Sequence, residues 1–160
     1  MKKWEQIKKD IDTEVKHILA EEPEEQRIIR TGELENKAGS YGQYWTTLDF
    51  ANGMIRDFSM YTMYPILKLA YEPIYTLDQL KKLIAVFHPP YTEYLGYSGY
   101  VTMLKFDRAF REALDTGDIA TKEEFISLYR SFLIYTNKMA AWSYHYFPWE
   151  IGFDWKQKVV

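Results

Sequence analysis

The chain has 160 residues, of which 47% are hydrophobic and 27% charged, and its formal net charge is −3, from 20 basic and 23 acidic residues. These values are typical of a globular protein with a sizeable core, so we expect one helical domain over residues 1–160. The lack of excess positive charge argues against nucleic-acid binding. The absence of cysteine excludes disulfides, thiolate metal sites and a cysteine nucleophile.

The start of the sequence favours a cytoplasmic protein. Met1 leads directly into the charged segment Lys2-Lys3-Trp4-Glu5, which lacks the apolar stretch of a signal peptide. No run of about 18 apolar residues that could span a bilayer follows in the sequence. We therefore expect a cytoplasmic location and no membrane partner.

The first third of the chain predicts two helices and a loop. An apolar stripe at helical spacing predicts an amphipathic helix over about residues 2–20, which Pro23 ends because proline cannot continue a helix. Residues 24–37 predict a short second helix, and Gly39 marks the loop after it. The stripe of the first helix consists of Trp4, Ile7, Ile11, Val15, Ile18 and Leu19.

The segment from about Gln43 to Tyr71 is the most apolar part of the chain. Its apolar side chains cover more than half of a helical circumference, which is typical of a helix in the centre of a bundle. Pro65 is expected to kink or break this helix. The main stripe consists of Tyr44, Leu48, Ala51, Ile55 and Phe58.

Two capping boxes mark the starts of later helices. Thr76 and Thr121 are each followed three residues later by a Gln or Glu, which predicts an N-cap at each threonine. The first of these helices stops before Pro89-Pro90. Another helix is expected over about residues 98–114, with Gly117 as its C-terminal stop. The helix that begins at Thr121 is expected to continue as far as Pro148.

The end of the chain is unusually aromatic. Trp149, Ile151, Phe153 and Trp155 alternate with polar or small residues, which predicts a short extended strap. Together these elements predict an all-α, single-domain bundle of five to six helices with an aromatic-rich core and an aromatic C-terminal strap. The aromatic content, 14 Tyr, 9 Phe and 5 Trp, supports that kind of core.

One polar strip interrupts the apolar central helix. Asp49, Asn52 and Arg56 fall within about 60° of each other at 100° per residue. Such a strip can line a pocket, with Arg56 as an anion clamp and Asp49 as a base or orienting acceptor. The alternative is a solvated helix edge or an internally satisfied set of side chains.

Aromatic segments supply the other candidate contacts. Tyr91, Tyr94, Tyr97 and Tyr100 recur every third residue, and tyrosine suits ligand or partner surfaces because its apolar ring carries a polar tip. Trp142 and His145 lie in a second aromatic cluster near the end of the chain. The alternative for both clusters is packing within the bundle.

Cofactor and metal motifs are absent from the sequence. His17 follows Glu14 at the spacing used in carboxylate-bridged metal bundles, but such sites need two copies and the sequence has one. Ser40 lies in a segment that resembles a nucleophile elbow, yet no strand precedes it. We therefore predict neither a cofactor nor a metal.

Two hypotheses for the function remain open. The first is a helical binding module that holds a small anionic or aromatic ligand in an aromatic-lined pocket, or docks a protein partner or a second copy through Tyr and Trp surfaces. The second is a small cofactor-independent enzyme that uses carboxylate and histidine acid–base chemistry, with Asp49 or His145 as base and Arg56 holding a substrate anion. The candidate ligand-binding residues in either case are Asp49, Asn52, Arg56, Tyr94, Tyr97, Trp142 and His145.

Overall fold

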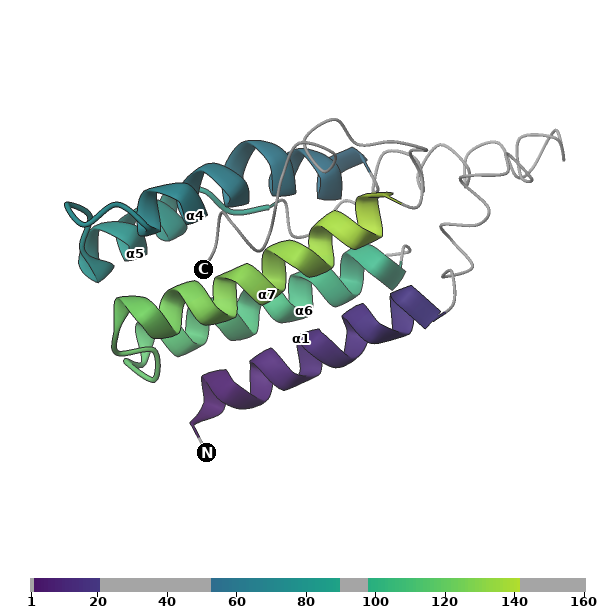
Figure 1. Cartoon of the computed structure of the whole chain (residues 1–160), viewed down its shortest axis with the longest axis horizontal. Helices are drawn as coiled ribbons and strands as arrows, with labels where there is room; N and C mark the ends of the chain where they lie inside the picture. Colours follow the sequence, from purple (N-terminus) through teal and green to yellow (C-terminus); the bar gives the residue numbers. More distant parts are fainter. Residues whose placement is uncertain (1, 21–52, 90–97, 142–160) are drawn as a thin grey trace, which may run out of the picture.

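The computed structural model describes residues 2–20, 53–89 and 98–141, and the regular elements in these ranges are all helical. This confirms the predicted all-α bundle. No helix within these ranges is long and apolar enough to cross a membrane. The predicted helix over residues 24–37 and the predicted strap from Trp149 to Trp155 lie outside them. The elements are α1 (Lys3–Ala20), the π-helix η1 (Phe58–Met63), α4 (Tyr64–Ala70), α5 (Leu77–Val86), α6 (Ser98–Asp115) and α7 (Lys122–Ala141) (Figure 1).

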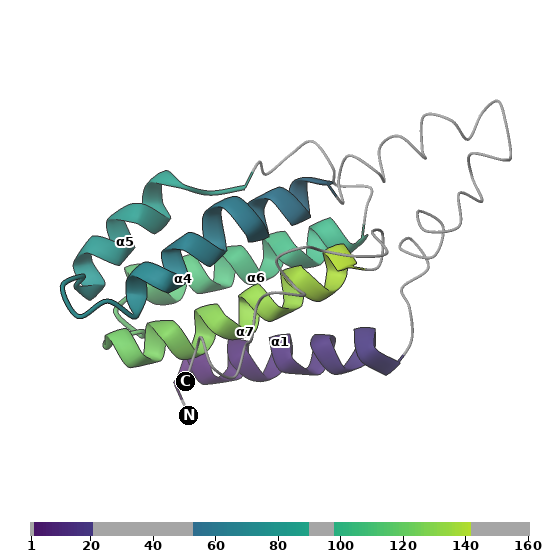
Figure 2. The same cartoon turned by 45° about the horizontal axis from the view of Figure 1, so that its top comes forward.

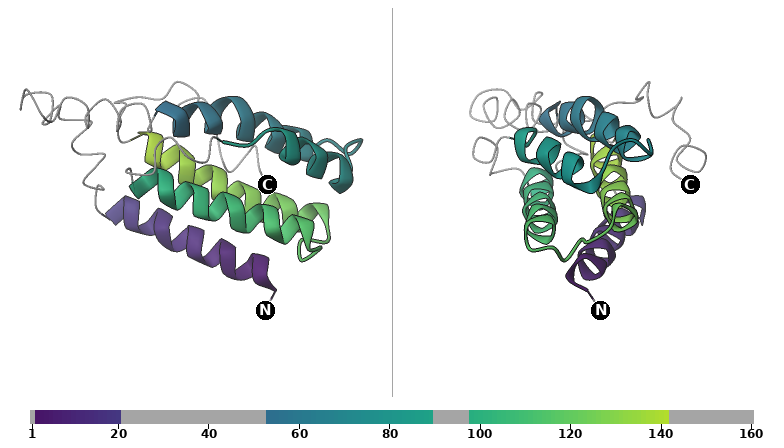
Figure 3. Two further views of the ribbon diagram at one scale, coloured as in Figure 1. Left: turned by 180° about the vertical axis from the view of Figure 1, so that it is seen from behind. Right: turned by 90° about the vertical axis from the view of Figure 1, so that its left-hand side faces the viewer.

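The helices lie roughly along one direction in stacked layers (Figure 2). The helical residues 53–57, η1 and α4 follow one another as a continuous rod, here called the central rod, and this rod and α5 form one layer. Seen end-on, α6 and α7 lie beneath that layer and α1 lies beyond them (Figure 3, right). The predicted helices over about 2–20 and 98–114 are confirmed by α1 and α6.

Helix α7 is the hub of this arrangement, since it contacts α1, α6, α4 and η1. The sequence favours the segment 43–71 as the central helix, but within the described ranges α7 holds that position. The reason is that its buried side chains, polar ones included, cover about two thirds of the helix circumference at 100° per residue. Its buried apolar residues are Phe125, Leu128, Tyr129, Phe132, Leu133, Tyr135 and Met139.

Aromatic rings from α6 and α7 fill the space between these two helices. The Phe110 ring stacks on Tyr129 with centroids 5.1 Å apart, and Phe125 lies 5.1 Å from the same Tyr129 ring. Phe106 meets Tyr135 edge to face at 5.2 Å. Such pairs contribute about 0.5–1.5 kcal/mol beyond the area they bury. Burial raises the pKa of both tyrosine hydroxyls well above the ordinary value, so both remain neutral phenols.

Both predicted capping boxes are present. At the start of α5 the Thr76 hydroxyl accepts from the Gln79 backbone N–H, and the Gln79 side chain accepts from the Thr76 N–H at 2.8 Å. Thr121 and Glu124 make the same reciprocal pair at the start of α7, at 3.1 and 3.0 Å. After α6, Gly117 has φ +79°, a conformation that favours glycine and ends the helix as predicted.

Pro65 does not break the central rod, so of the two predicted effects, a kink or a break, the structure excludes the break. Proline lacks an N–H, and its ring collides with the carbonyl four residues earlier in a regular α-helix. The preceding residues adopt a π-helical turn instead, in which the Tyr64 N–H donates to the Ser59 carbonyl five residues before it. The wider turn accommodates Pro65 in the first turn of α4, where proline is tolerated.

An ion pair within α6, between the buried Asp107 and Arg111, is connected to α5 through the arginine. Asp107 is 1% exposed and accepts from Arg111 Nε at 2.9 Å. The guanidinium also donates through Nη1 to the Ile84 carbonyl and through Nη2 to the Phe87 carbonyl at 2.9 Å. Ile84 lies in the last turn of α5 and Phe87 directly follows the helix, so their carbonyls lack N–H donors within it. Arg111 therefore caps α5 and also neutralises Asp107.

The first turn of α1 is held by the loop and helix that follow α6. The Asp118 carboxylate accepts from the backbone N–H groups of Lys3 and Trp4, the latter at 2.7 Å. Glu124 accepts from the Trp4 indole N–H and from Lys2 Nζ, both at 3.0 Å. The backbone N–H of Ala120 contributes most to lowering the pKa of Glu124 to about 2, followed by Lys2.

We expect Arg111→Met to destabilise the bundle by about 3–5 kcal/mol, because it leaves the Asp107 carboxylate buried without its counter-charge. Urea denaturation at pH 7 measures this loss. Lys105→Met, an exposed change on the same helix, is the matched control and should alter the free energy of unfolding by less than about 0.5 kcal/mol. A decrease in the free energy of unfolding of less than about 1 kcal/mol for Arg111→Met would show that the ion pair contributes little to the stability of the bundle.

We expect Glu124→Gln to lower the melting temperature at pH 7. The folded pKa of about 2 lies below the ordinary 4.5, so the carboxylate stabilises the fold above pH 4.5 and loses this effect as the pH falls toward 2. The variant should therefore lose less stability than the wild type between these two pH values, as measured by thermal unfolding. Glu123→Gln, an exposed neighbour, is the control. Parallel curves for Glu124→Gln and wild type would contradict this role.

Candidate functional site

Most of the residues selected from the sequence lie outside the described ranges, so their part in a ligand site stays a prediction. Arg56 is described, in the turn of the central rod directly before η1. The residues that lie outside are Asp49, Asn52, Tyr94, Tyr97, Trp142 and His145.

Arg56 is held at the surface of the central rod by its neighbour in the sequence. Its Nε donates to Asp57 Oδ1 at 3.2 Å, and its Nη2 lies 3.2 Å from the same oxygen. Both side chains are partly exposed, at 36% and 45%. A pair this well solvated contributes at most about 1 kcal/mol to stability. About a third of the Arg56 side chain is exposed and thus accessible to an anionic group.

Next along the rod, η1 meets α7 through buried polar atoms. Ser59, Met63 and Thr136 are all fully buried. Thr136 Oγ1 lies 3.0 Å from Ser59 Oγ, 3.0 Å from the Leu133 carbonyl oxygen and 3.6 Å from Met63 Sδ. Because a threonine hydroxyl carries one proton, it can serve only one of these acceptors at a time. This polar contact joins the π-helical turn to α7.

Asn137 follows Thr136 in α7 and differs from its polar neighbours. It is fully buried, yet neither its amide nitrogen nor its amide oxygen has a hydrogen-bond partner in the described part of the structure. An unsatisfied buried polar group costs about 1–3 kcal/mol, and here a single side chain carries a donor and an acceptor in that state. Unsatisfied polar groups of this kind are uncommon in folded proteins and point to a role outside folding.

The face of α7 that carries Asn137 adjoins the face on which Thr136 contacts the central rod, about 100° around the helix. Arg130, Leu133 and Asn137 fall within about 60° on a helical projection. Burial raises the pKa of Tyr71, at the end of α4, and the nearby Arg130 charge partly offsets the rise. Arg130 therefore lies near the far end of the rod, while Thr136 contacts Ser59. Because α7 and the rod run antiparallel (Figure 1), Asn137 lies near the level of the rod's first described turns.

The sequence contains few signals that predict this contact. Thr136 lies at helical spacing with the apolar residues of the last helix, and no motif includes Ser59 or Asn137. The available signal was a lone amide between Leu133 and Met139, in a helix that is apolar on most sides. The π-helical turn that places Ser59 and Met63 against α7 depends on the tertiary structure.

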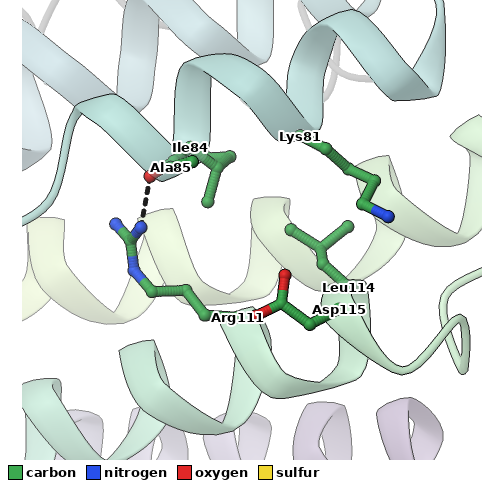
Figure 4. A pocket seen from close by; sticks show the side chains of 6 residues that line it. All are labelled: Lys81, Ile84, Ala85, Arg111, Leu114 and Asp115. Atoms are coloured by element: carbon green, nitrogen blue, oxygen red, sulfur yellow. Dashed lines mark hydrogen bonds between the residues drawn. The ribbon is translucent and has the colours of Figure 1, made fainter.

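A small cavity lies elsewhere, between α5 and α6 (Figure 4). Its volume is about 90 Å³, below the roughly 300 Å³ at which ligand pockets begin. Figure 4 shows the Arg111 guanidinium reaching across to the Ile84 carbonyl at one end, with Lys81 and Asp115 at the other. Because its arginine is engaged in capping α5, we interpret this cavity as part of the packing between the two helices.

A larger and more open groove, of about 290 Å³, lies between α1 and α6. Its floor contains Ile7, Ala109 and Ala113, and charged or polar side chains line its edges. The groove is shallow, and none of the candidate residues from the sequence lines it. The region around the contact between η1 and α7 therefore remains the better candidate site, because the neighbouring Asn137 amide is buried without a hydrogen-bond partner in the described part of the structure.

Comparison with solved structures agrees with this helical architecture, whereas no curated protein matches the chain. Among solved structures, one described as the structure of McbB in complex with tryptophan matches with a TM-score of 0.71 and 29% sequence identity. The match covers 94% of this chain and 48% of McbB, so the chain spans about half the length of that protein.

The family comparison covers most of the sequence. The model described as the cucumopine synthase C-terminal helical bundle domain matches residues 4–146. That range includes every described helix apart from the first residue of α1. The chain therefore belongs to the family of the cucumopine synthase C-terminal helical bundle domain.

Proposed function

We propose that this chain is the helical, ligand-binding half of a synthase-type protein and that it holds a free amino acid with an aromatic side chain. The observation that carries this proposal is the likeness to McbB, at 29% identity over 94% of this chain, in a structure that contains tryptophan. The proposed site lies where the start of the central rod meets the end of α7.

The chemistry of that region supports an amino acid as the ligand. An amino acid such as tryptophan carries a carboxylate, an ammonium group and an aromatic ring, which fits the anionic or aromatic ligand expected from the sequence. Arg56 offers a partly exposed guanidinium for the carboxylate. Asp49 and Asn52, on the strip predicted from the sequence, would continue the polar lining. Tyr94, Tyr97, Trp142 and His145 are proposed to enclose the ring.

The bundle is also proposed to dock another polypeptide or domain. A match to 48% of McbB supports a reaction site completed by the other half, whether that half lies in the same chain or in a partner. Exposed apolar side chains on the layer of the central rod and α5 suit such a contact: Tyr61 is 71% exposed, Ile74 74% and Phe87 50%.

The alternative from the sequence, an enzyme whose acid–base chemistry is contained in this chain, makes a different prediction. It requires Asp49 or His145 to act on the substrate held by Arg56. The description of the family as part of a synthase supports catalysis by the whole protein. Turnover by the isolated chain would favour the alternative, whereas ligand binding without turnover would favour a binding half.

Isothermal titration with L-tryptophan tests the proposal, with tryptamine as the analogue that lacks a carboxylate. We expect the chain to bind L-tryptophan and Arg56→Ala to weaken that binding by about tenfold, which corresponds to about 1.4 kcal/mol. Binding of tryptamine should not change in the variant. The melting temperature should fall by less than about 3 °C, because the ion pair with Asp57 is solvent-screened.

Lys68→Ala is the matched control, since it also removes one exposed positive charge from the central rod. It should leave L-tryptophan binding unchanged. Equal losses in the two variants would indicate a general charge effect and not a carboxylate clamp. A large fall in melting temperature for Arg56→Ala would show that Arg56 is structural, and no binding to the wild type would refute the proposed function.

A further inference from the structure

Asn137 is a residue that folding alone does not explain. Its side chain is fully buried in α7, and both polar atoms of its amide are without hydrogen-bond partners in the described ranges. Leucine has nearly the same size and shape and no polar atoms to desolvate, so it would suit this position better if packing were its only role.

Tyr129 provides a useful comparison, because its hydroxyl is also buried without a hydrogen-bond partner. Its ring stacks on Phe110 and lies close to Phe125, and its pKa is raised by burial and by Asp107 of α6. The aromatic packing explains why the position holds a large ring. Asn137 has no such area to bury, so the cost of its desolvated amide has no comparable compensation in the bundle.

The position of Asn137 fits a ligand contact. The neighbouring Thr136 touches Ser59 in the π-helical turn, and π-helical turns occur frequently at functional sites. Asn137 shares a helix face with Arg130, whose charge acts on Tyr71 at the end of the rod. Because α7 and the rod run antiparallel, Asn137 lies near the level of the rod's first described turns, which carry Arg56.

We propose that the Asn137 amide reads the head group of the amino-acid ligand, an inference that rests on the proposed function. The amide oxygen accepts from the ligand ammonium, and the amide nitrogen donates to the ligand carboxylate. An α-amino acid carries both groups on one carbon, so one asparagine side chain can contact both. Asn137 then selects free amino acids over amines or acids that carry the same ring, and the stability lost in folding is offset only when the ligand is bound.

The test compares Asn137→Leu with Tyr129→Phe, since each removes buried polar atoms without partners and keeps the bulk of the side chain. Both variants should melt a few degrees higher than the wild type in the absence of ligand. Only Asn137→Leu should weaken L-tryptophan binding, by about 10- to 100-fold, as expected for lost hydrogen bonds to charged groups. Tyr129→Phe should bind L-tryptophan as the wild type does.

Analogues identify the groups that Asn137 contacts. The wild type should prefer L-tryptophan to tryptamine and to indole-3-propionate, which lack the carboxylate and the ammonium respectively. In Asn137→Leu these preferences should shrink, because the amide that distinguishes the head groups is gone. If the leucine variant does not fold, Asn137→Ala carries the same comparison of affinities.

Three outcomes overturn the inference, and they can be told apart. Asn137→Leu that melts higher but binds L-tryptophan within about twofold of the wild type would show that the amide is only a folding cost. Equal loss for L-tryptophan and both analogues would assign Asn137 to the shape of the site and not to head-group recognition. A wild type that does not bind L-tryptophan would refute the proposed function itself, and this inference with it.

Discussion

The constraint on which the rest of this structure depends is the burial of α7 over about two thirds of its circumference. A helix buried this widely must be covered by several partners, and α1, α6, α4 and η1 supply that cover. The aromatic rings of Tyr129 and Phe125 fill the contact with α6, where Phe110 stacks on Tyr129 and meets Phe125 edge to face. The hydroxyls of Ser59 and Thr136 connect α7 to the central rod. Each neighbouring helix is thus positioned by its contact with α7.

Polar side chains fix the outer helices once α7 is covered. Arg111 ties the last turn of α5 to α6 and compensates the buried Asp107 charge. Asp118 and Glu124 hold the first turn of α1 against the start of α7. In each case one side chain satisfies backbone or side-chain groups of a different helix, so the ends of the bundle are aligned by hydrogen bonds and its middle by apolar packing.

At the candidate site one buried polar side chain is not satisfied in this way. The buried polar atoms of Ser59 and Thr136 satisfy each other, and the Asp107 charge is paired, but among the described residues the Asn137 amide has no hydrogen-bond partner. A residue that destabilises the fold can be retained because it contributes to ligand binding, and such residues occur at functional sites. The ligand contact proposed for Asn137, which rests on the likeness to a structure that contains tryptophan, is of this kind. The bundle spans about half of that neighbour, so the complete reaction site is proposed to include groups from outside it.

The sequence by itself determined the helical class and most helix ends, because these depend on residues a few positions apart. Thr76 and Thr121 with their partners three residues on, the apolar stripe of α1, and Gly117 after α6 are signals of that local kind. It also placed Arg56 on a polar strip of the central rod, whose other members lie outside the described ranges. Only the tertiary structure decided the π-helical passage before Pro65, the Arg111 cap on α5 and the unsatisfied Asn137 amide. These features depend on contacts such as that between Thr136 and Ser59, whose partners lie 77 positions apart in the sequence and leave no periodic or local pattern.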